Sequence, residues 1–207
     1  VAVSMMWALL KPADYFAVDW CSQRPGGGPT FIDLIHELDS LRFICGEISQ
    51  VCALASAAVR KFAVEDSLSL SLAFENGALG SVVASDVTPA PWSYEATTGE
   101  NPYYFSTDEN CYHFLGTLGS LAFPQLDLWR YANEGRSGWQ HPLVKSRCEI
   151  VAQDPLLLQL EHFYRVIRNG EKPLVDGCDG RRSLEVTLAV LESAQHQMPI
   201  ALPEYNK

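Results

Sequence analysis

The sequence predicts an α+β domain in which an open, predominantly antiparallel sheet carries helices packed on one face. Three observations lead to this prediction. One helical segment lies early in the chain, a long run of short strand-like segments follows, and two helical segments close the chain. The 207 residues are 47% apolar and 19% charged, which suits one large domain with a substantial core. An antiparallel sheet of this kind leaves its other face for a ligand or a partner subunit.

The first elements are a strand, a loop and a helix. Residues 1–10 (VAVSMMWALL) are apolar and partly β-branched, which predicts a strand. A loop rich in aromatic residues and glycine follows, and residues 30–45 then read as a helix that stops at Gly46. Helical spacing predicts an apolar stripe of Phe31, Leu34, Ile35, Leu38, Leu41 and Cys45. An adjoining flank holds Ile32, His36, Asp39 and Phe43.

The central segments have the period of strands. Residues 47–60 suggest one strand, and residues 66–74 alternate so that Leu68, Leu70 and Leu72 share a face. Asn76-Gly77 between this run and the next predicts a β-hairpin. Further strands are expected within ENCYHFLGT (109–117), GSLAFPQ (119–125), LDLWRYA (126–132) and SRCEIVA (146–152).

Two helices are expected at the end of the chain. The first begins with Asp154 as N-cap and Pro155 at the first helical position, and it ends at Gly170. The second covers residues 179–197 and ends before Pro199. Asp176 and Asp179 lie in the turn before it and are expected to cap it.

Composition narrows the choice of partners and compartment. A net charge of -10 argues against nucleic acid and against an anionic membrane surface. No apolar run is long enough to cross a membrane. The six cysteines form no C-x-x-C pair, so we expect buried, reduced thiols and a cytoplasmic location. His141, His162 and His196 have no metal-ligand spacing, and we expect no metal.

His36 is the first candidate for chemistry. Asp33 lies three residues before it and Asp39 three residues after it, so either carboxylate could reach the imidazole on a helix. A carboxylate partner would orient the ring and raise its basicity, as a general base requires. The same spacing also fits a partly exposed histidine on a solvated helix face, and both interpretations stay open.

The segment GGGPTFIDLIHELDSLRFICGE (26–47) resembles the start of the C-terminal domain in one enzyme family. This is the glucose–fructose oxidoreductase/inositol dehydrogenase (Gfo/Idh/MocA) family, which carries a Gly-Gly-Gly…His-x-x-Asp pattern there. DYFAVDW (14–20), NCYHFLGTLGSLAFP (110–124) and residues 154–194 continue the resemblance in the same order.

The resemblance implies that residues 1–207 are the C-terminal substrate-binding and oligomerisation domain of an NAD- or NADP-dependent oxidoreductase. Such an enzyme acts on a small-molecule hydroxy compound, such as a sugar or polyol, by hydride transfer. Its cofactor is bound mainly by an N-terminal Rossmann domain, which this chain lacks, so the chain alone is expected to be inactive. The family has a catalytic lysine in a Glu-Lys-Pro segment of its Rossmann domain. This chain has a Glu-Lys-Pro at residues 171–173, but it lies between the last two helices, so its lysine is not the catalytic one.

The site residues follow from the resemblance position by position. His36 falls on the catalytic histidine of the family. The aspartate that often lies four residues before that histidine is replaced by Ile32, and Asp33 could take its place.

Two further groups complete the expected site. Gly26, Gly27 and Gly28 would lie near nicotinamide, although a tight turn explains them equally well. Lys11, Tyr15 and Trp92 are candidates for substrate binding.

The expected partner is a second copy of the chain, held through the open sheet face. Val82, Val83, Leu70 or Leu72 would need cover there, since large exposed apolar faces are rare in monomers. The alternative function is a non-catalytic domain that keeps the fold for dimerisation or for binding a small ligand.

Overall fold

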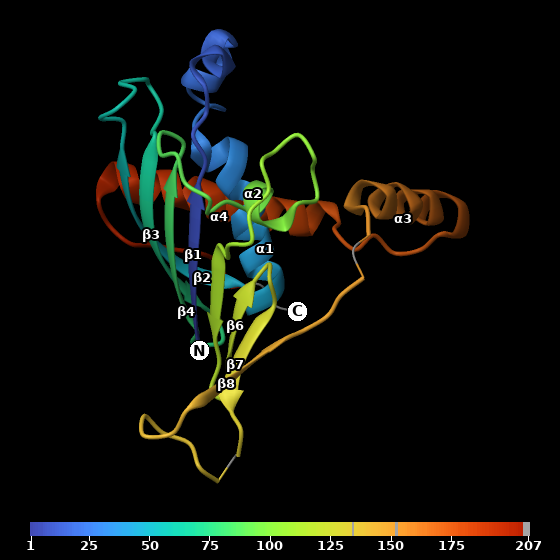
Figure 1. The fold of residues 1–207 in the computed structure, drawn as a ribbon. Helices are drawn as coiled ribbons and strands as arrows, with labels where there is room; N and C mark the ends of the chain where they lie inside the picture. Colours follow the sequence, from blue (N-terminus) through green and yellow to red (C-terminus); the bar gives the residue numbers. More distant parts are fainter. Residues whose placement is uncertain (134, 152, 205–207) are drawn as a thin grey trace.

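The computed structural model describes residues 1–133, 135–151 and 153–204. Within these residues nine strands form one sheet in the order β8-β7-β6-β5-β1-β4-β3-β2-β9 (Figure 1). β1 runs parallel to β4, and the other neighbouring pairs are antiparallel. The strands are β1 (Ala2–Ala8), β2 (Ile48–Ser56), β3 (Ser67–Phe74), β4 (Leu79–Ser85), β5 (Tyr112–Leu115), β6 (Ser120–Phe123), β7 (Asp127–Tyr131), β8 (Leu143–Arg147) and β9 (Ile200–Ala201). The predicted α+β class is confirmed.

The helical elements are η1 (Ala13–Ala17), η2 (Asp19–Ser22), η3 (Thr30–Leu34), α1 (Ile35–Cys45), α2 (Tyr94–Thr98), α3 (Pro155–Asn169) and α4 (Gly177–His196). η1 and η2 are short 3₁₀ turns in the predicted loop. The helix expected over 30–45 is present, but its first turn, η3, is a π-helix that runs directly into α1. Gly46 ends α1 with a φ of 94°, a value that favours glycine.

The core lies between one face of the sheet and the helices α1 and α4. Leu34, Leu38 and Leu41 have no exposed area, so the predicted stripe is confirmed at its centre. They join the cluster of buried strand residues Val3, Met5, Trp7, Val51, Ala53, Leu68, Leu70, Leu72, Val82 and Ala84, and the α4 residues Val186, Ala189 and Val190. Figure 1 shows α1 and α4 on the same side of the sheet. Burial of this apolar area is the main stabilising contribution to the fold.

The predicted hairpin joins β3 to β4. Gly77 has a φ of 82°, and its N–H donates to the carbonyl of Phe74 at 2.9 Å. The side chain of Asn76 donates to the carbonyl of Cys45 at 2.7 Å. The hairpin therefore also satisfies a carbonyl at the end of α1, one of those that a helix leaves without an internal partner.

Several expected elements differ from the structure. α2 and β9 were not predicted, because each is short and has little periodicity. The strand expected over 146–152 is shifted: β8 ends at Arg147, residues 148–151 are irregular, and residue 152 lies outside the described residues. Cys52, Cys148 and Cys178 are exposed, so the expectation of buried thiols is wrong for them, although all six cysteines are free.

The open face of the sheet carries other residues than expected. Leu70, Leu72 and Val82 point to the helices and are buried, so the prediction that they need cover is wrong. Val83, at 48% exposed, does lie on the open face. Its neighbours there include Ser4, Ser69, Ser71, Ser81 and His113, all of them exposed. Among the described residues, no helix has the length and apolar character needed to cross a membrane.

Candidate functional site

A buried ion pair lies just beyond the carboxyl end of β1. Lys11 Nζ is 2.5 Å from Asp33 Oδ2, and their side chains are only 7% and 11% exposed. The main chain of Lys11 is fixed at both ends: its N–H donates to the carbonyl of Asp86, and its carbonyl accepts from Arg60 Nη2. Asp33 comes from η3, so the start of the helix and the end of the central strand meet at this pair.

Aromatic rings surround the Lys11 ammonium group. Nζ lies 4.7 Å from the centre of the Tyr15 ring and 5.6 Å from that of Trp7. Both distances are within the range of a cation–π contact. Burial raises the pKa of Tyr15, with nearby Cys21 and Asp33 adding to the shift. The structure therefore brings Lys11, Tyr15 and Asp33 together, a proximity that the sequence did not predict.

Two further carboxyl groups complete the cluster. Glu37, one helical turn after Asp33, is 4% exposed, and its Oε2 atom has no hydrogen-bond partner among the described residues. Glu95 on α2 accepts a hydrogen bond from Trp7 Nε1 at 3.1 Å. We call Lys11, Asp33, Glu37 and Glu95 the carboxyl cluster.

The carboxyl cluster disfavours negative charge. Burial raises the pKa of Glu37 to about 8, and the charges of Glu95 and Asp33 act in the same direction. Burial also raises the pKa of Asp33 to about 6, because the opposing effect of Lys11 is smaller. At neutral pH the cluster therefore holds a neutral Glu37 next to the ionised pair.

His36 lies on the same helix, directly before Glu37 in the sequence. Its side chain is exposed, and in the described part of the chain Asp33 bonds to Lys11 and not to His36. The π-helical turn at Thr30–Leu34 precedes His36, so the α-helical spacing assumed for the Asp33–His36 pair does not hold there. Whether His36 acts on a substrate stays a prediction.

Trp92 and the glycine loop lie at the same end of the sheet. The Trp92 carbonyl accepts from the N–H of Ala8 at 2.8 Å, which places this residue beside the last residue of β1. A Cβ atom on Gly27 would lie 2.4 Å from the carbonyl oxygen of Trp20. Gly28 has a φ of 86°, and a Cβ there would lie 2.7 Å from Glu65 Oε1. Close packing within the protein therefore explains Gly27 and Gly28, whereas a Cβ on Gly26 would meet no atom within 4 Å.

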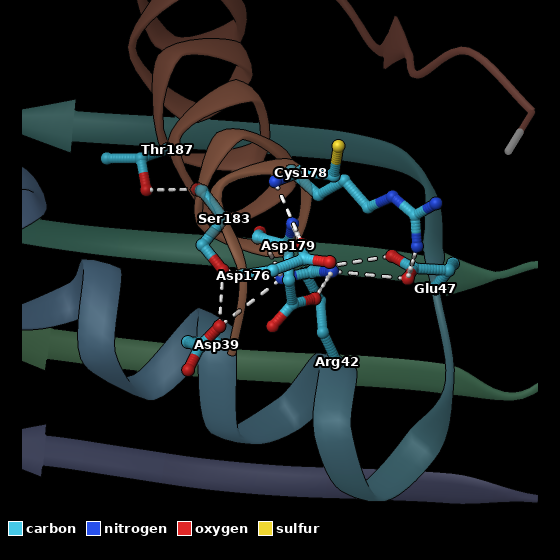
Figure 2. Close-up of polar contacts among 9 residues, drawn as sticks. Asp39, Arg42, Glu47, Asp176, Cys178, Asp179, Ser183 and Thr187 are labelled. Carbon is cyan, nitrogen blue, oxygen red and sulfur yellow. Dashed lines mark hydrogen bonds and ion pairs between the residues drawn. The ribbon is translucent and has the colours of Figure 1, made fainter. Parts of the chain in front are cut away.

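A second polar cluster joins α1 to α4 and has a structural role. Arg42 is 5% exposed and binds Glu47 through Nε and Nη2, at 2.9 and 3.1 Å (Figure 2). It also contacts Asp179 at 2.8 Å and Asp39 at 3.3 Å. Ser183 donates to Asp39. Asp39 therefore helps to hold α1 against α4.

The expected capping of α4 is partly confirmed. Asp176 accepts from the N–H groups of Cys178 and Asp179, at 2.9 and 3.0 Å. The side chain of Asp179 does not cap the helix but binds Arg42, because it lies in the first turn and faces α1 (Figure 2).

The sequence did not identify Glu37 or Glu95. Glu37 lies next to the apolar stripe, and a charged residue at a buried position is itself a functional signal. Glu95 lies on α2, a short helix that was not predicted. No sequence pattern connected the two residues with Lys11.

The chain matches the family model described as the C-terminal alpha/beta domain of an oxidoreductase family over residues 1–202. It therefore belongs to the Gfo/Idh/MocA oxidoreductase family. The curated protein scyllo-inositol 2-dehydrogenase (NAD(+)) of Bacillus subtilis is 26% identical over 181 residues, which are 84% of this chain and 48% of that protein.

Solved structures show the same fold. The WlbA dehydrogenase of Bordetella pertussis, in complex with NADH and UDP-GlcNAcA, has a TM-score of 0.70 at 20% identity. The aldose-aldose oxidoreductase of Caulobacter crescentus, complexed with glycerol, has a TM-score of 0.69 at 21% identity. The two matches cover 99% and 97% of this chain, and each covers 55% of the matched chain. The chain thus spans about half the length of the relatives that it matches.

Proposed function

We propose that this domain forms the substrate side of an NAD- or NADP-dependent oxidoreductase that acts on a hydroxyl-bearing carbon of a sugar, polyol or related compound. The observation that carries the proposal is the buried Lys11–Asp33 pair at the carboxyl end of β1, in a chain that belongs to an oxidoreductase family. In the reaction, hydride leaves carbon for the nicotinamide ring while the hydroxyl group releases its proton.

The proposal assigns His36 to proton transfer and Lys11, Tyr15 and Trp92 to substrate binding. Asp33 would hold Lys11 in place instead of orienting the imidazole. The exposed position of His36 supports this role, because a general base must reach its substrate.

The test of His36 is turnover in the intact enzyme. His36→Ala should lower kcat by about 10²–10⁴-fold, the usual contribution of a general acid–base group, with a smaller change in KM. His141→Ala, a change in an exposed turn before β8, is the matched control. Unchanged turnover of His36→Ala under conditions where chemistry is rate-limiting would remove His36 from the mechanism.

The cofactor is assigned to a Rossmann domain outside residues 1–207, with Gly26–Gly28 near the nicotinamide. The sequence supports this because it has no G-x-G-x-x-G after a strand, the arrangement that places pyrophosphate at a helix N-terminus. Calorimetry of the 207-residue chain with NADH and NADPH should give no saturable heat. A micromolar dissociation constant would contradict the assignment.

We also propose a homo-oligomer through the open sheet face and a cytoplasmic location. Leu54, Leu79 and Val83 are 64%, 61% and 48% exposed on strands of this face, and small serines between them allow close approach of a second sheet. The free thiols fit a reducing compartment. Light scattering that gives a monomer for the intact protein at high concentration would contradict the oligomer.

The second candidate is a non-catalytic domain for dimerisation or ligand binding. It is favoured by Ile32, which replaces the aspartate of the family, and by the absence of a bond from Asp33 to His36 in the described residues. An intact protein that binds neither NAD nor NADP would support this candidate.

A further inference from the structure

The carboxyl cluster contains more acidic groups than cationic ones. Asp33, Glu37 and Glu95 surround a site whose ammonium group, on Lys11, is already bound to Asp33. Asp86 lies near as well, but it is bound to Arg60 at 3.1 Å. A ligand group that enters the cluster therefore meets an environment with no free positive charge from these residues.

One buried oxygen in the cluster has an unused hydrogen-bonding capacity. Glu37 Oε2 has no partner among the described residues, and buried polar atoms without partners are rare. The titratable groups that act on Glu37 or respond to it are Asp33 from η3, Glu95 and Tyr94 from α2, and Cys111 before β5. None of these four is a cation, and the neutral Glu37 carboxyl can use this oxygen to bond a ligand group that both donates and accepts, as a hydroxyl does.

We propose that the carboxyl cluster selects substrates by charge: it accepts an uncharged hydroxyl or an ammonium group and rejects a carboxylate. The inference rests on the proposed function, because it describes which hydroxy compounds this domain admits. Hydroxyl and ammonium groups both donate hydrogen bonds, which an ionised carboxylate such as that of Asp33 requires. A carboxylate on the substrate brings only acceptors and a further negative charge.

The protonation of Glu37 supports the same selection. Desolvation and the charges of Glu95 and Asp33 keep the carboxyl group of Glu37 neutral. Desolvation and repulsion act equally on a carboxylate that a ligand brings to this place. A neutral hydroxy compound is therefore preferred over the corresponding acid.

Trp7 provides a direct readout of binding. Its indole N–H donates to Glu95, and its ring lies beside Lys11, so a ligand in the cluster must alter the indole ¹⁵N–¹H resonance. The probes are glycerol, methylammonium chloride and sodium acetate, titrated into the intact protein at pH 7 and constant ionic strength. Trp139, which is 93% exposed, reports non-specific effects of each probe.

We expect saturable shifts of the Trp7 resonance with glycerol or methylammonium, and an apparent affinity for acetate at least about tenfold weaker. Glu95→Gln keeps an acceptor for Trp7 but removes one charge, so it should narrow the difference between acetate and methylammonium by about three- to tenfold. Glu100→Gln removes a carboxylate from the exposed loop after α2 and should leave the difference unchanged.

Three results would overturn the inference. Acetate could bind as tightly as the other probes, Glu95→Gln could leave the selectivity unchanged, or no probe could shift the Trp7 resonance. Binding of NADH to the same sample is measured in parallel. If NADH does not bind, the proposed function is refuted and the charge selection still stands. If NADH binds but no probe shifts the Trp7 resonance, or acetate binds most tightly, only the charge selection is refuted.

Discussion

Helices α3 and α4 begin with the same sequence signal and have different surroundings. Asp154 accepts two backbone N–H groups at the start of α3, and Asp176 does the same for α4. α4 then buries Val186, Ala189 and Val190 against the sheet, whereas the described residues bury no side chain of α3. Figure 1 shows α3 projecting beyond the sheet. Capping residues thus determine where a helix starts, and its contacts decide whether it stabilises the domain.

The two helices should differ most in how much their arginine contacts contribute to the free energy of unfolding. Arg42→Met removes the guanidinium that joins α1 to α4 and leaves Glu47, Asp39 and Asp179 without it, at a cost of about 3–5 kcal/mol in the free energy of unfolding. Arg165→Met breaks the exposed pair with Glu171 on α3 and should cost about 0–1 kcal/mol. Urea unfolding of both variants measures this difference, and equal losses would contradict it.

The pH dependence of stability should come from Glu37 on α1, which packs on the sheet, and not from α3. The pKa of Glu37 is about 8 in the folded chain against an ordinary 4.5, so folding takes up a proton in this interval. The stabilising contribution is complete below about pH 4.5 and is lost as pH rises through 8, by on the order of a few kcal/mol. Glu37→Gln should flatten this part of the profile, as measured by urea unfolding at pH 5, 6.5 and 8. The same slope in wild type and variant would assign it to other groups.

Truncation of an apolar side chain should give the next largest difference in stability between α4 and α3. Val190→Ala on α4 opens a cavity at a position with no exposed area and should cost about 2 kcal/mol. Leu160→Ala on α3, at 65% exposed, should change the stability of the 207-residue chain by less than about 0.5 kcal/mol. Thermal unfolding of the two variants gives the comparison. A large loss from Leu160→Ala would show that α3 packs on the domain in solution.

The smallest effect concerns the two caps. Asp176→Ala should lower the stability of the whole domain by about 1 kcal/mol, because α4 unfolds together with the core. Asp154→Ala should reduce helix content by circular dichroism without moving the unfolding midpoint, because α3 frays independently. A shift of the midpoint in Asp154→Ala would contradict that independence.

The sequence predicted the parts of the fold that local rules control. The alternation of residues 66–74, the Asn76-Gly77 turn and the ends of α1 and α3 depend on neighbouring residues, and the structure has them as expected. The position of β1 between β4 and β5 depends on contacts over long sequence separations, which no local pattern reports. β8 was misplaced because Cys148, Ile150 and Val151 are apolar, although residues 148–151 belong to no strand.

The candidate site was predicted in part for the same reason. Lys11, Tyr15 and Asp33 were named, and the structure brings them together. The pairing of Asp33 with His36 assumed a regular α-helix, and the π-helical turn changed the direction of the side chains. Glu37 and Glu95, 58 residues apart in the sequence, come near each other only in the folded chain, so they could be found only in three dimensions.

The parallel pairing of β1 with β4 sets an order for folding. β2, β3 and β4 are consecutive antiparallel strands with short connections, so they can pair as soon as residue 85 is available. β1 must wait for β4, 77 residues further along where Val3 meets Gly80, and for β5, which begins at Tyr112. Loop closure over such distances slows folding. During synthesis β1 emerges before the other strands of this sheet but is therefore among the last to be enclosed, and its apolar side chains Met5 and Trp7 stay accessible to chaperones until β5 has emerged.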